Sequence, residues 1–148
     1  MSEQFRVLMV CTANHCRSPL AERMLVQELQ DREPAGPIWT VRSAGTDGLV
    51  DRPMHPYAEQ VLAERGIDGS DFRGRDLTEA IARDADLILT ATREHRTQVL
   101  RVSPAVLSRT FTVKQFARLA AAVPERPGVD AAARGHELVR QARLPGRW

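Results

Sequence analysis

The sequence of 148 residues lacks several features that define large classes of proteins. It has no run of about 18 apolar residues, so no membrane-spanning segment is predicted. The apolar run at residues 7–10 is too short for the core of a signal peptide, which predicts a cytoplasmic protein without membrane association. Only two cysteines are present, Cys11 and Cys16, and their closeness excludes a fold built on disulfide bonds.

The size and composition indicate one ordinary globular domain over residues 1–148. A chain of this length buries roughly two-thirds of the surface that its unfolded form exposes. The content of 43% hydrophobic and 27% charged residues is typical of such a domain, and no repeat or low-complexity segment occurs. We expect the protein to be a monomer.

The net charge of +2 is unevenly distributed along the chain. Residues 1–92 contain 10 basic and 15 acidic side chains, a balance of −5, whereas residues 93–148 contain 11 and 4, a balance of +7. A basic half can form a nucleic-acid surface. Here the arginines are dispersed and have no interleaved aromatics, so a solvated helical face is favoured and no nucleic-acid partner is predicted.

Apolar runs and amphipathic segments alternate along the chain. The predicted strands cover residues 5–10, 38–43, 86–90 and 110–113. The predicted helices cover residues 19–31, 56–65, 78–83, 92–101, 113–123 and 130–143. Loops are predicted at residues 33–37, 124–128 and 144–146. We therefore expect an α/β fold with a four-stranded parallel sheet, helices on both of its faces, and a phosphate-binding loop between the first strand and the first helix.

Capping residues place several of these helix ends. Ser18 is the predicted N-cap of the first helix, with Pro19 at the first helical position. Gly66 is the predicted C-cap of the second helix, and Thr78 or Asp76 the N-cap of the third.

The segment C-T-A-N-H-C-R-S-P at residues 11–19 lies where an α/β fold binds its ligand, after the first strand and before the first helix. A loop of this length can turn successive backbone N–H groups inward, and the helix dipole adds positive potential. We therefore predict a site for a tetrahedral oxyanion, formed by Thr12, Ala13, Asn14, His15, Cys16 and Arg17.

Two side chains add chemistry to this loop. A thiol at the amino end of a helix ionises readily, and the thiolate of Cys11 would be a nucleophile for phosphorus. Arg17 has the planar donor fork that grips two phosphate oxygens. Ser18 can donate to the sulfur when it leaves, and Asn14 can brace the turn or adopt left-handed geometry. The alternative is that Cys11 is a small buried residue ending a strand, but its position before a capped helix favours catalysis.

With these residues the chain resembles the low-molecular-weight protein tyrosine phosphatase family, whose hallmark is C-x5-R-S/T, commonly C-x-x-N-x-C-R-S-P. Similar stretches occur at residues 43–46, 75–78, 85–89 and 110–112. The resemblance implies a nucleophile at Cys11, a phosphate clamp of Arg17 with the loop amides, and a loop-shaping network of Asn14, Ser18 and Ser43. It also implies hydrolysis of phosphomonoesters, mainly protein phosphotyrosine, through a phosphocysteine and without a cofactor.

Three positions depart from the family pattern. Phe72 stands where the family usually has a histidine of the loop network, and Leu49 and Val50 replace an aromatic wall that would stack on phosphotyrosine. The family's general acid is the aspartate of a D-P-[YD] motif after the last helix, and no Asp-Pro pair occurs in the sequence.

The missing acid leaves two interpretations. We expect that a terminal segment carrying an acidic loop is absent from this sequence, because its removal would also leave the +7 balance of residues 93–148. The alternative is a protein without this acid. Asp130 is a further acidic candidate, but its place at a predicted helix start favours an N-cap role.

Cys16 and His15 have open roles. Cys16 could form a reversible disulfide that protects Cys11 from over-oxidation, or it could be a packed small residue. We expect His15 to face solvent at the pocket rim. The four histidines have no metal-ligand spacing, and no metal is predicted.

Two other functions remain open. Arsenate is isosteric with phosphate, so an arsenate reductase could share the loop, but no cysteine follows Cys16 and an external thiol would be needed. Without its acid, the chain could instead be a non-catalytic phosphate-binding module.

Overall fold

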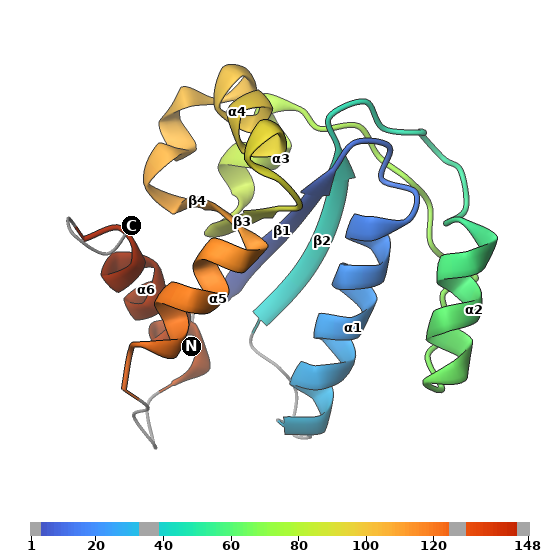
Figure 1. Cartoon of the computed structure of the whole chain (residues 1–148), viewed down its shortest axis with the longest axis horizontal. Helices are drawn as coiled ribbons and strands as arrows, with labels where there is room; N and C mark the ends of the chain where they lie inside the picture. Colours follow the sequence, from blue (N-terminus) through green and yellow to red (C-terminus); the bar gives the residue numbers. More distant parts are fainter. Residues whose placement is uncertain (1–3, 33–38, 125–129, 145–148) are drawn as a thin grey trace.

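The computed structural model of the chain describes residues 4–32, 39–124 and 130–144. Its centre is a sheet of four parallel strands in the order β2-β1-β3-β4. The strands are β1 (Phe5–Cys11), β2 (Trp39–Gly45), β3 (Leu87–Thr90) and β4 (Thr110–Thr112). Figure 1 shows their carboxyl ends meeting at one edge of the sheet, where the loop after β1 lies. The predicted α/β fold is confirmed.

Alternation along β1 divides the core between the two faces of the sheet. Phe5, Val7 and Met9 point to a face covered by α1 (Arg17–Arg32), α5 (Val113–Ala121) and α6 (Ala131–Ala142). Leu8 and Val10 point to the other face, which is covered by α3 (Glu79–Asp84), α4 (Arg93–Val102) and the 3-10 helix η1 (Pro104–Arg109). Helices on both faces are what a parallel sheet requires to bury its strands.

A third apolar cluster lies beyond the edge of the sheet. The helix α2 (Pro56–Glu64) packs on the outer side of α1. The buried residues of this cluster are Ala58 and Leu62 of α2, with Met54 before the helix and Phe72 after it. Cys16 and Leu20 lie against this cluster, so the loop after β1 is supported from the side of α2 as well.

The first helix begins at Arg17, two residues earlier than predicted. Ser18 is not its N-cap, because α1 already starts at Arg17 and the buried Ser18 lies inside its first turn. The Ser18 hydroxyl is bonded to neighbours in the loop instead. The sequence prediction also missed η1, where Pro104 starts a short helix between α4 and β4.

Other helix ends agree with the sequence more closely. Thr78 caps α3 and Asp130 caps α6, each accepting a hydrogen bond from a backbone N–H of the first turn. This confirms the N-cap role of Asp130. The prediction of Gly66 as the C-cap of α2 is wrong by one residue: the C-cap is Arg65, and Gly66 follows it with a φ of 74°.

Parts of several predicted segments lie outside the described residues. These are the loop at 33–37, the first residue of the strand at 38–43, residues 125–128 of the loop at 124–128, and residues 145–146 of the last loop. Within the described ranges, no helix has the length and apolar character needed to cross a membrane.

Candidate active site

The loop between β1 and α1 turns its carbonyl groups outward, toward the segments that surround it. The carbonyl oxygens of Cys11, Thr12 and Ala13 accept hydrogen bonds from the backbone N–H groups of residues 46, 47 and 49. The His15 carbonyl accepts another from His55 N at 2.7 Å. Among the described residues, no hydrogen bond is donated by the N–H groups of residues 12–18. The loop therefore has the form of an anion-binding nest at the amino end of α1.

The end of β2 fits tightly against this loop because residue 45 has no side chain. A Cβ atom on Gly45 would lie 2.4 Å from the carbonyl oxygen of Thr12 and 2.8 Å from the backbone nitrogen of Asn14. Gly45 is also held from its other side, because its N–H donates to the Arg75 carbonyl at 3.0 Å. Backbone atoms of three segments thus fix the loop.

Asn14 lies at the centre of the hydrogen bonds inside the loop. It is almost fully buried and has a φ of 51°, a left-handed conformation that asparagine tolerates better than most residues. Its Oδ1 accepts from the Arg75 backbone N–H at 2.8 Å, and its Nδ2 donates to Ser18 Oγ at 2.9 Å. The predicted bracing role of Asn14 is thus matched by contacts on both atoms of its amide.

Ser18 passes this network on to the candidate nucleophile. The Oγ of Ser18 lies 2.9 Å from the sulfur of Cys11, which is buried at the end of β1. Because the Ser18 oxygen already accepts from Asn14, its own proton is free to point at the Cys11 sulfur. The Ser18 hydroxyl can therefore donate a hydrogen bond to that sulfur.

Arg17 is the first residue of α1, directly after the loop. It is exposed, and none of the described acidic residues forms an ion pair with it. A cavity of about 190 Å³ opens beside it, lined by Arg17 and Ser18 and by apolar side chains of β1, β3 and α5. An anion held by the loop amides would therefore meet an unpaired guanidinium.

Ser43 belongs to a different network from the one predicted. Its hydroxyl donates to Glu22 Oε1 at 2.7 Å, and Arg23 Nε bonds the other oxygen of Glu22 at 2.9 Å. Ser43 therefore ties β2 to α1 rather than contacting Asn14 or Ser18. The sequence analysis missed Glu22, because an acid within an amphipathic helix gives no sign that it will be buried.

The side chain of Phe72 makes no hydrogen bond to the loop, because it has no polar atom. It is buried in the cluster under α2, and the guanidinium carbon of Arg23 lies 5.6 Å from the centre of its ring. The donor to Asn14 Oδ1 comes from the Arg75 backbone. A backbone N–H thus supplies a hydrogen bond to this network even though Phe72 cannot.

His95, at the start of α4, is a second residue that the sequence analysis missed. Its Nε2 lies 2.7 Å from Thr12 Oγ1 and its Nδ1 lies 2.9 Å from the hydroxyl of Thr92, the N-cap of α4. Burial lowers the pKa of His95, and the positive charge of Arg17 lowers it further, while Glu94 acts in the opposite direction. His95 is therefore a neutral link between the phosphate loop and α4 at neutral pH.

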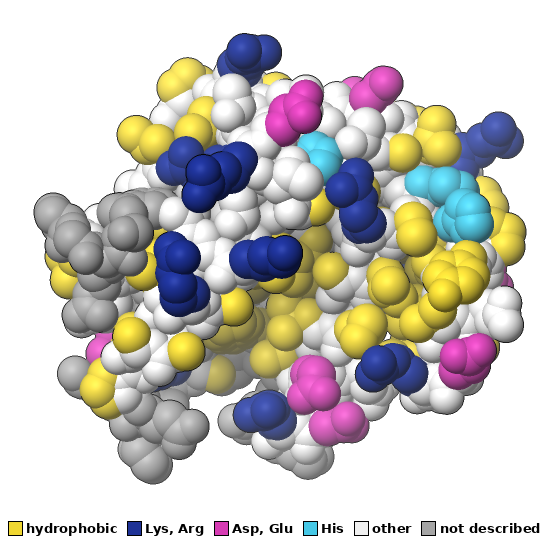
Figure 2. Space-filling view, in the orientation of Figure 1, with side chains coloured by type: hydrophobic (Ala, Val, Ile, Leu, Met, Phe, Trp, Pro, Cys, Tyr) yellow, Lys and Arg dark blue, Asp and Glu magenta, His cyan; other side chains and the backbone are white. Residues whose placement is uncertain are grey.

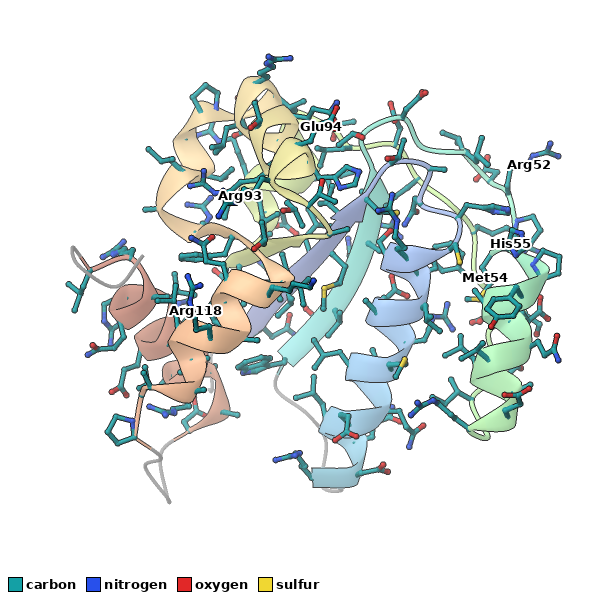
Figure 3. All side chains as sticks on the ribbon, viewed as in Figure 1. Arg52, Met54, His55, Arg93, Glu94 and Arg118 are labelled. Atoms are coloured by element: carbon teal, nitrogen blue, oxygen red, sulfur yellow. The ribbon has the colours of Figure 1, made fainter. Side chains whose placement is uncertain are left out.

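His15 and Cys16 contact the segment before α2. His15 is half-buried rather than facing solvent, because its Nδ1 lies 3.1 Å from the Pro53 carbonyl and its ring meets the His55 ring edge-on at 5.3 Å. Both cysteines are free, and Cys16 packs against the cluster that includes Met54. Figure 3 labels Met54 and His55 at the start of α2.

Leu49 and Val50 lie in the turn after β2, which borders the loop. Their side chains are 42% and 56% exposed, so neither is part of the core. Tyr57 on α2 is also exposed, and Figure 2 shows hydrophobic side chains gathered on this side of the molecule. Leu49 and Val50 thus add exposed apolar surface beside the loop, although neither is aromatic.

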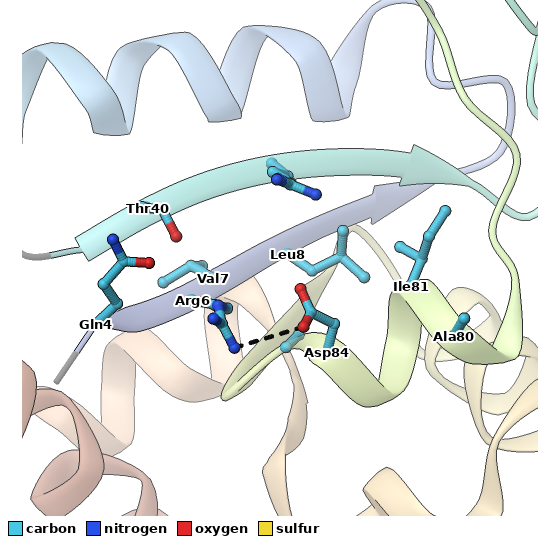
Figure 4. Close-up of a pocket in the computed structure, with 10 residues that line it drawn as sticks. Gln4, Arg6, Val7, Leu8, Thr40, Ala80, Ile81 and Asp84 are labelled. Atoms are coloured by element: carbon cyan, nitrogen blue, oxygen red, sulfur yellow. Dashed lines mark hydrogen bonds and ion pairs between the residues drawn. The ribbon is translucent and has the colours of Figure 1, made fainter.

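A larger cavity, of about 490 Å³, lies away from the loop, between α3 and the open face of β1 and β2. Figure 4 shows its lining, which includes an ion pair of 3.4 Å between Arg6 and Asp84. None of its described lining residues is a cysteine. The described residues also hold no group of three His, Cys, Asp or Glu side chains placed to bind a metal ion.

Comparison with known proteins gives consistent matches. The family described as low molecular weight phosphotyrosine protein phosphatase matches residues 6–127. The low molecular weight protein-tyrosine-phosphatase Etp of Escherichia coli (strain K12) is 40% identical over 110 residues, which are 74% of this chain and 70% of Etp. A protein-arginine-phosphatase of Geobacillus stearothermophilus is 32% identical over 112 residues, which are 76% of this chain and 71% of that protein.

A solved structure extends this similarity over nearly the whole chain. The low molecular weight protein tyrosine phosphatase from T. tengcongensis is 32% identical and superposes with a TM-score of 0.69, covering 93% of this chain and 97% of its own.

The close contact at Gly45 leads to a first prediction. Gly45→Ala should weaken the binding of inorganic phosphate by about tenfold or more, because the new methyl group would displace backbone atoms of the loop. Gly66→Ala is the matched control, since it strains a positive φ but meets no atom within 4 Å. Isothermal titration calorimetry measures both. Phosphate affinity equal to wild type in Gly45→Ala would contradict the fit described here.

The lowered pKa of His95 leads to a second prediction. Below its ordinary value of about 6.5, the unfolded chain binds more protons at this residue than the folded chain does. The free energy of unfolding should therefore rise with pH up to about 6.5, and this stability is lost as the pH falls toward the lowered pKa. His95→Gln should show a shallower rise. Urea unfolding between about pH 5 and pH 7 tests this, and equal slopes for both proteins would refute it.

Proposed function

The chain belongs to the low molecular weight phosphotyrosine protein phosphatase family, and we propose that it hydrolyses protein phosphotyrosine through a covalent bond between phosphate and Cys11. The observation that supports this mechanism best is the Asn14–Ser18–Cys11 chain of hydrogen bonds beside a loop of unused N–H groups. It places the Cys11 sulfur, with Ser18 as a hydrogen-bond partner, next to an anion site.

In the first step the Cys11 thiolate attacks phosphorus, a P–S bond forms, and the P–O bond to the tyrosine breaks. The electron pair of that bond leaves with the phenolate oxygen. The loop amides and Arg17 hold the three equatorial oxygens, whose charge develops during transfer.

In the second step a water molecule attacks the phosphocysteine, and the P–S bond breaks to release inorganic phosphate. The sulfur leaves with the electron pair as a thiolate. Ser18 favours this departure by donating its proton toward the sulfur, which is why we assign it to the catalytic residues together with Cys11 and Arg17. We assign phosphate binding to the amides of Thr12, Ala13, Asn14, His15 and Cys16.

The supporting roles follow from the contacts. We propose that Asn14 and Ser18 shape the loop directly, and that Ser43 acts at one remove, by fixing β2 to α1 through Glu22. A thiolate nucleophile needs a reducing compartment, which supports a cytoplasmic location. The monomeric state stays a prediction.

The substrate class has one further candidate. One relative is named a protein-arginine-phosphatase, and the rim of this site carries Leu49 and Val50 in place of an aromatic wall. Matched peptides with phosphotyrosine and with phosphoarginine separate the two. We expect a higher kcat/KM for the phosphotyrosine peptide, and the reverse order would assign the chain to the arginine-phosphatase type.

The mechanism predicts the behaviour of Cys11→Ser. Wild type should hydrolyse p-nitrophenyl phosphate in the presence of a chelator, because p-nitrophenolate leaves without protonation. Cys11→Ser should lose this activity by about 10³-fold or more, since a hydroxyl is a far weaker nucleophile than a thiolate. Cys16→Ser is the matched control and should remain active. Turnover that survives in Cys11→Ser would refute the mechanism.

The same assay separates the alternative functions. Thiol-dependent release of arsenite from arsenate, without hydrolysis of p-nitrophenyl phosphate, would make the chain an arsenate reductase. Phosphate binding without turnover of any phosphomonoester would make it a binding module.

Cys16 leads to a redox prediction. We propose that a sulfenic acid formed at Cys11 by peroxide condenses with the Cys16 thiol, giving a disulfide and one water molecule. Peroxide should then inactivate wild type in a way that dithiothreitol reverses. In Cys16→Ser the sulfenic acid has no neighbouring thiol, so excess peroxide should oxidise it further to a sulfinic acid, which dithiothreitol does not reduce. If both proteins recover equally, Cys16 is only the packed residue that its contacts with the α2 cluster describe.

A further inference from the structure

The carboxyl ends of β3 and β4 place a row of basic side chains beside the phosphate loop. The two strands are neighbours, with Thr90 paired to Thr112, and each is followed at once by a helix. Arg93 starts α4, while Lys114 and Arg118 lie on α5. Figure 3 labels Arg93 on α4 and Arg118 on α5.

These side chains line a continuous depression that starts at the site. The cavity beside Arg17 shares Ala91 with a second cavity of about 260 Å³, which Arg93, Lys114, Gln115 and Arg118 line. A third cavity of about 450 Å³ continues from Arg93 and Gln115 to Arg96 and Thr97. We call the second and third cavities together the basic trough. Ala91 also connects the second cavity to the site by a hydrogen bond. Its N–H donates to the carbonyl of Val10, the residue before Cys11.

Three cations of the basic trough, Arg93, Lys114 and Arg118, form no ion pair with a described residue. No Asp or Glu is among the described residues that line either cavity. Five arginines elsewhere pair with an acid, namely Arg6, Arg23, Arg32, Arg83 and Arg134. Arg93, Lys114 and Arg118 are exposed and have no such partner within residues 4–32, 39–124 and 130–144. Figure 2 shows dark-blue side chains over α4 and α5 with no magenta between them.

The chemistry of the lining selects the kind of ligand. The rest of the lining consists of Arg96, Ala91, Gln115 and three threonines. None of the described lining residues is aromatic, so they offer no stacking platform for nucleotide bases. The flexible cations of the basic trough lie next to the loop. They suit the carboxylate side chains of a substrate protein whose phosphate is already bound in that loop. We propose that the basic trough binds acidic residues flanking the phosphotyrosine, so that acidic phosphoproteins are the preferred substrates. This inference rests on the proposed function.

The direct test compares two phosphotyrosine peptides, one with glutamates on both sides of the phosphotyrosine and one with glutamines there. The acidic peptide should bind Cys11→Ser about tenfold tighter at low salt, and the difference should shrink as salt is added. Adding Arg93→Ala, Lys114→Ala and Arg118→Ala should remove the difference. Adding Arg65→Ala, Arg101→Ala and Arg140→Ala instead, which removes the same charge from other exposed positions, should preserve it.

The outcomes separate this inference from the proposed function. Equal affinity for both peptides, or a preference that the control set also abolishes, overturns the inference, while hydrolysis of the neutral peptide by wild type still supports the function. A single-stranded oligonucleotide that binds more tightly than the acidic peptide and displaces it would make the basic trough a nucleic-acid surface and would also overturn the inference.

A second measurement uses the wild-type chain and needs no substitution. Lys114 is the only lysine in the sequence, so its acetylation by a water-soluble anhydride is easily followed by mass spectrometry. A non-hydrolysable phosphonate analogue of the acidic peptide should slow the acetylation of Lys114 several-fold more than the neutral analogue does. Equal protection by the two analogues would overturn the inference.

Discussion

The side chain of Asn14 joins the parts of the molecule on which the loop depends. Its Oδ1 accepts from the backbone of residue 75 and its Nδ2 donates to Ser18, so one buried amide links a distant segment to the first turn of α1. A left-handed backbone costs about 1 kcal/mol for most residues. Two buried hydrogen bonds offset this, at about 1 kcal/mol each. The conformation of the loop is thus maintained by the side chain of the residue that adopts it.

This constraint explains why the loop can leave its N–H groups unused. A short loop with free donors is stable only if its carbonyl oxygens are satisfied elsewhere and its backbone is prevented from relaxing. The turn after β2 supplies the donors for three carbonyls, and Gly45 lets that turn approach closely. The protein therefore provides the loop with partners for its acceptors and reserves its donors for an anion.

The sequence predicted the strands, the layered fold and the loop because each depends on local pattern. Alternation along residues 5–10 and the helix signals around Pro19 are visible in one stretch of chain. The contacts of Glu22 and His95 were missed because they join residues far apart in sequence, such as Ser43 with Glu22 and Thr12 with His95. Ser18 was predicted as a cap because a serine before a proline usually caps. In the folded chain its hydroxyl bonds Asn14 and Cys11 instead.

The amino end of α4 connects the chemistry of the loop to the basic surface beside it. His95 contacts Thr12 of the loop through one ring nitrogen and the N-cap Thr92 through the other. Arg93, two residues earlier on the same helix, lines the basic trough. Because the positive charge of Arg17 favours the neutral form of His95, a phosphate that compensates this charge would also reduce its effect on His95. Phosphate in the loop would thus act on the first turn of α4 through His95, and an acidic segment in the basic trough would act on the same turn through Arg93.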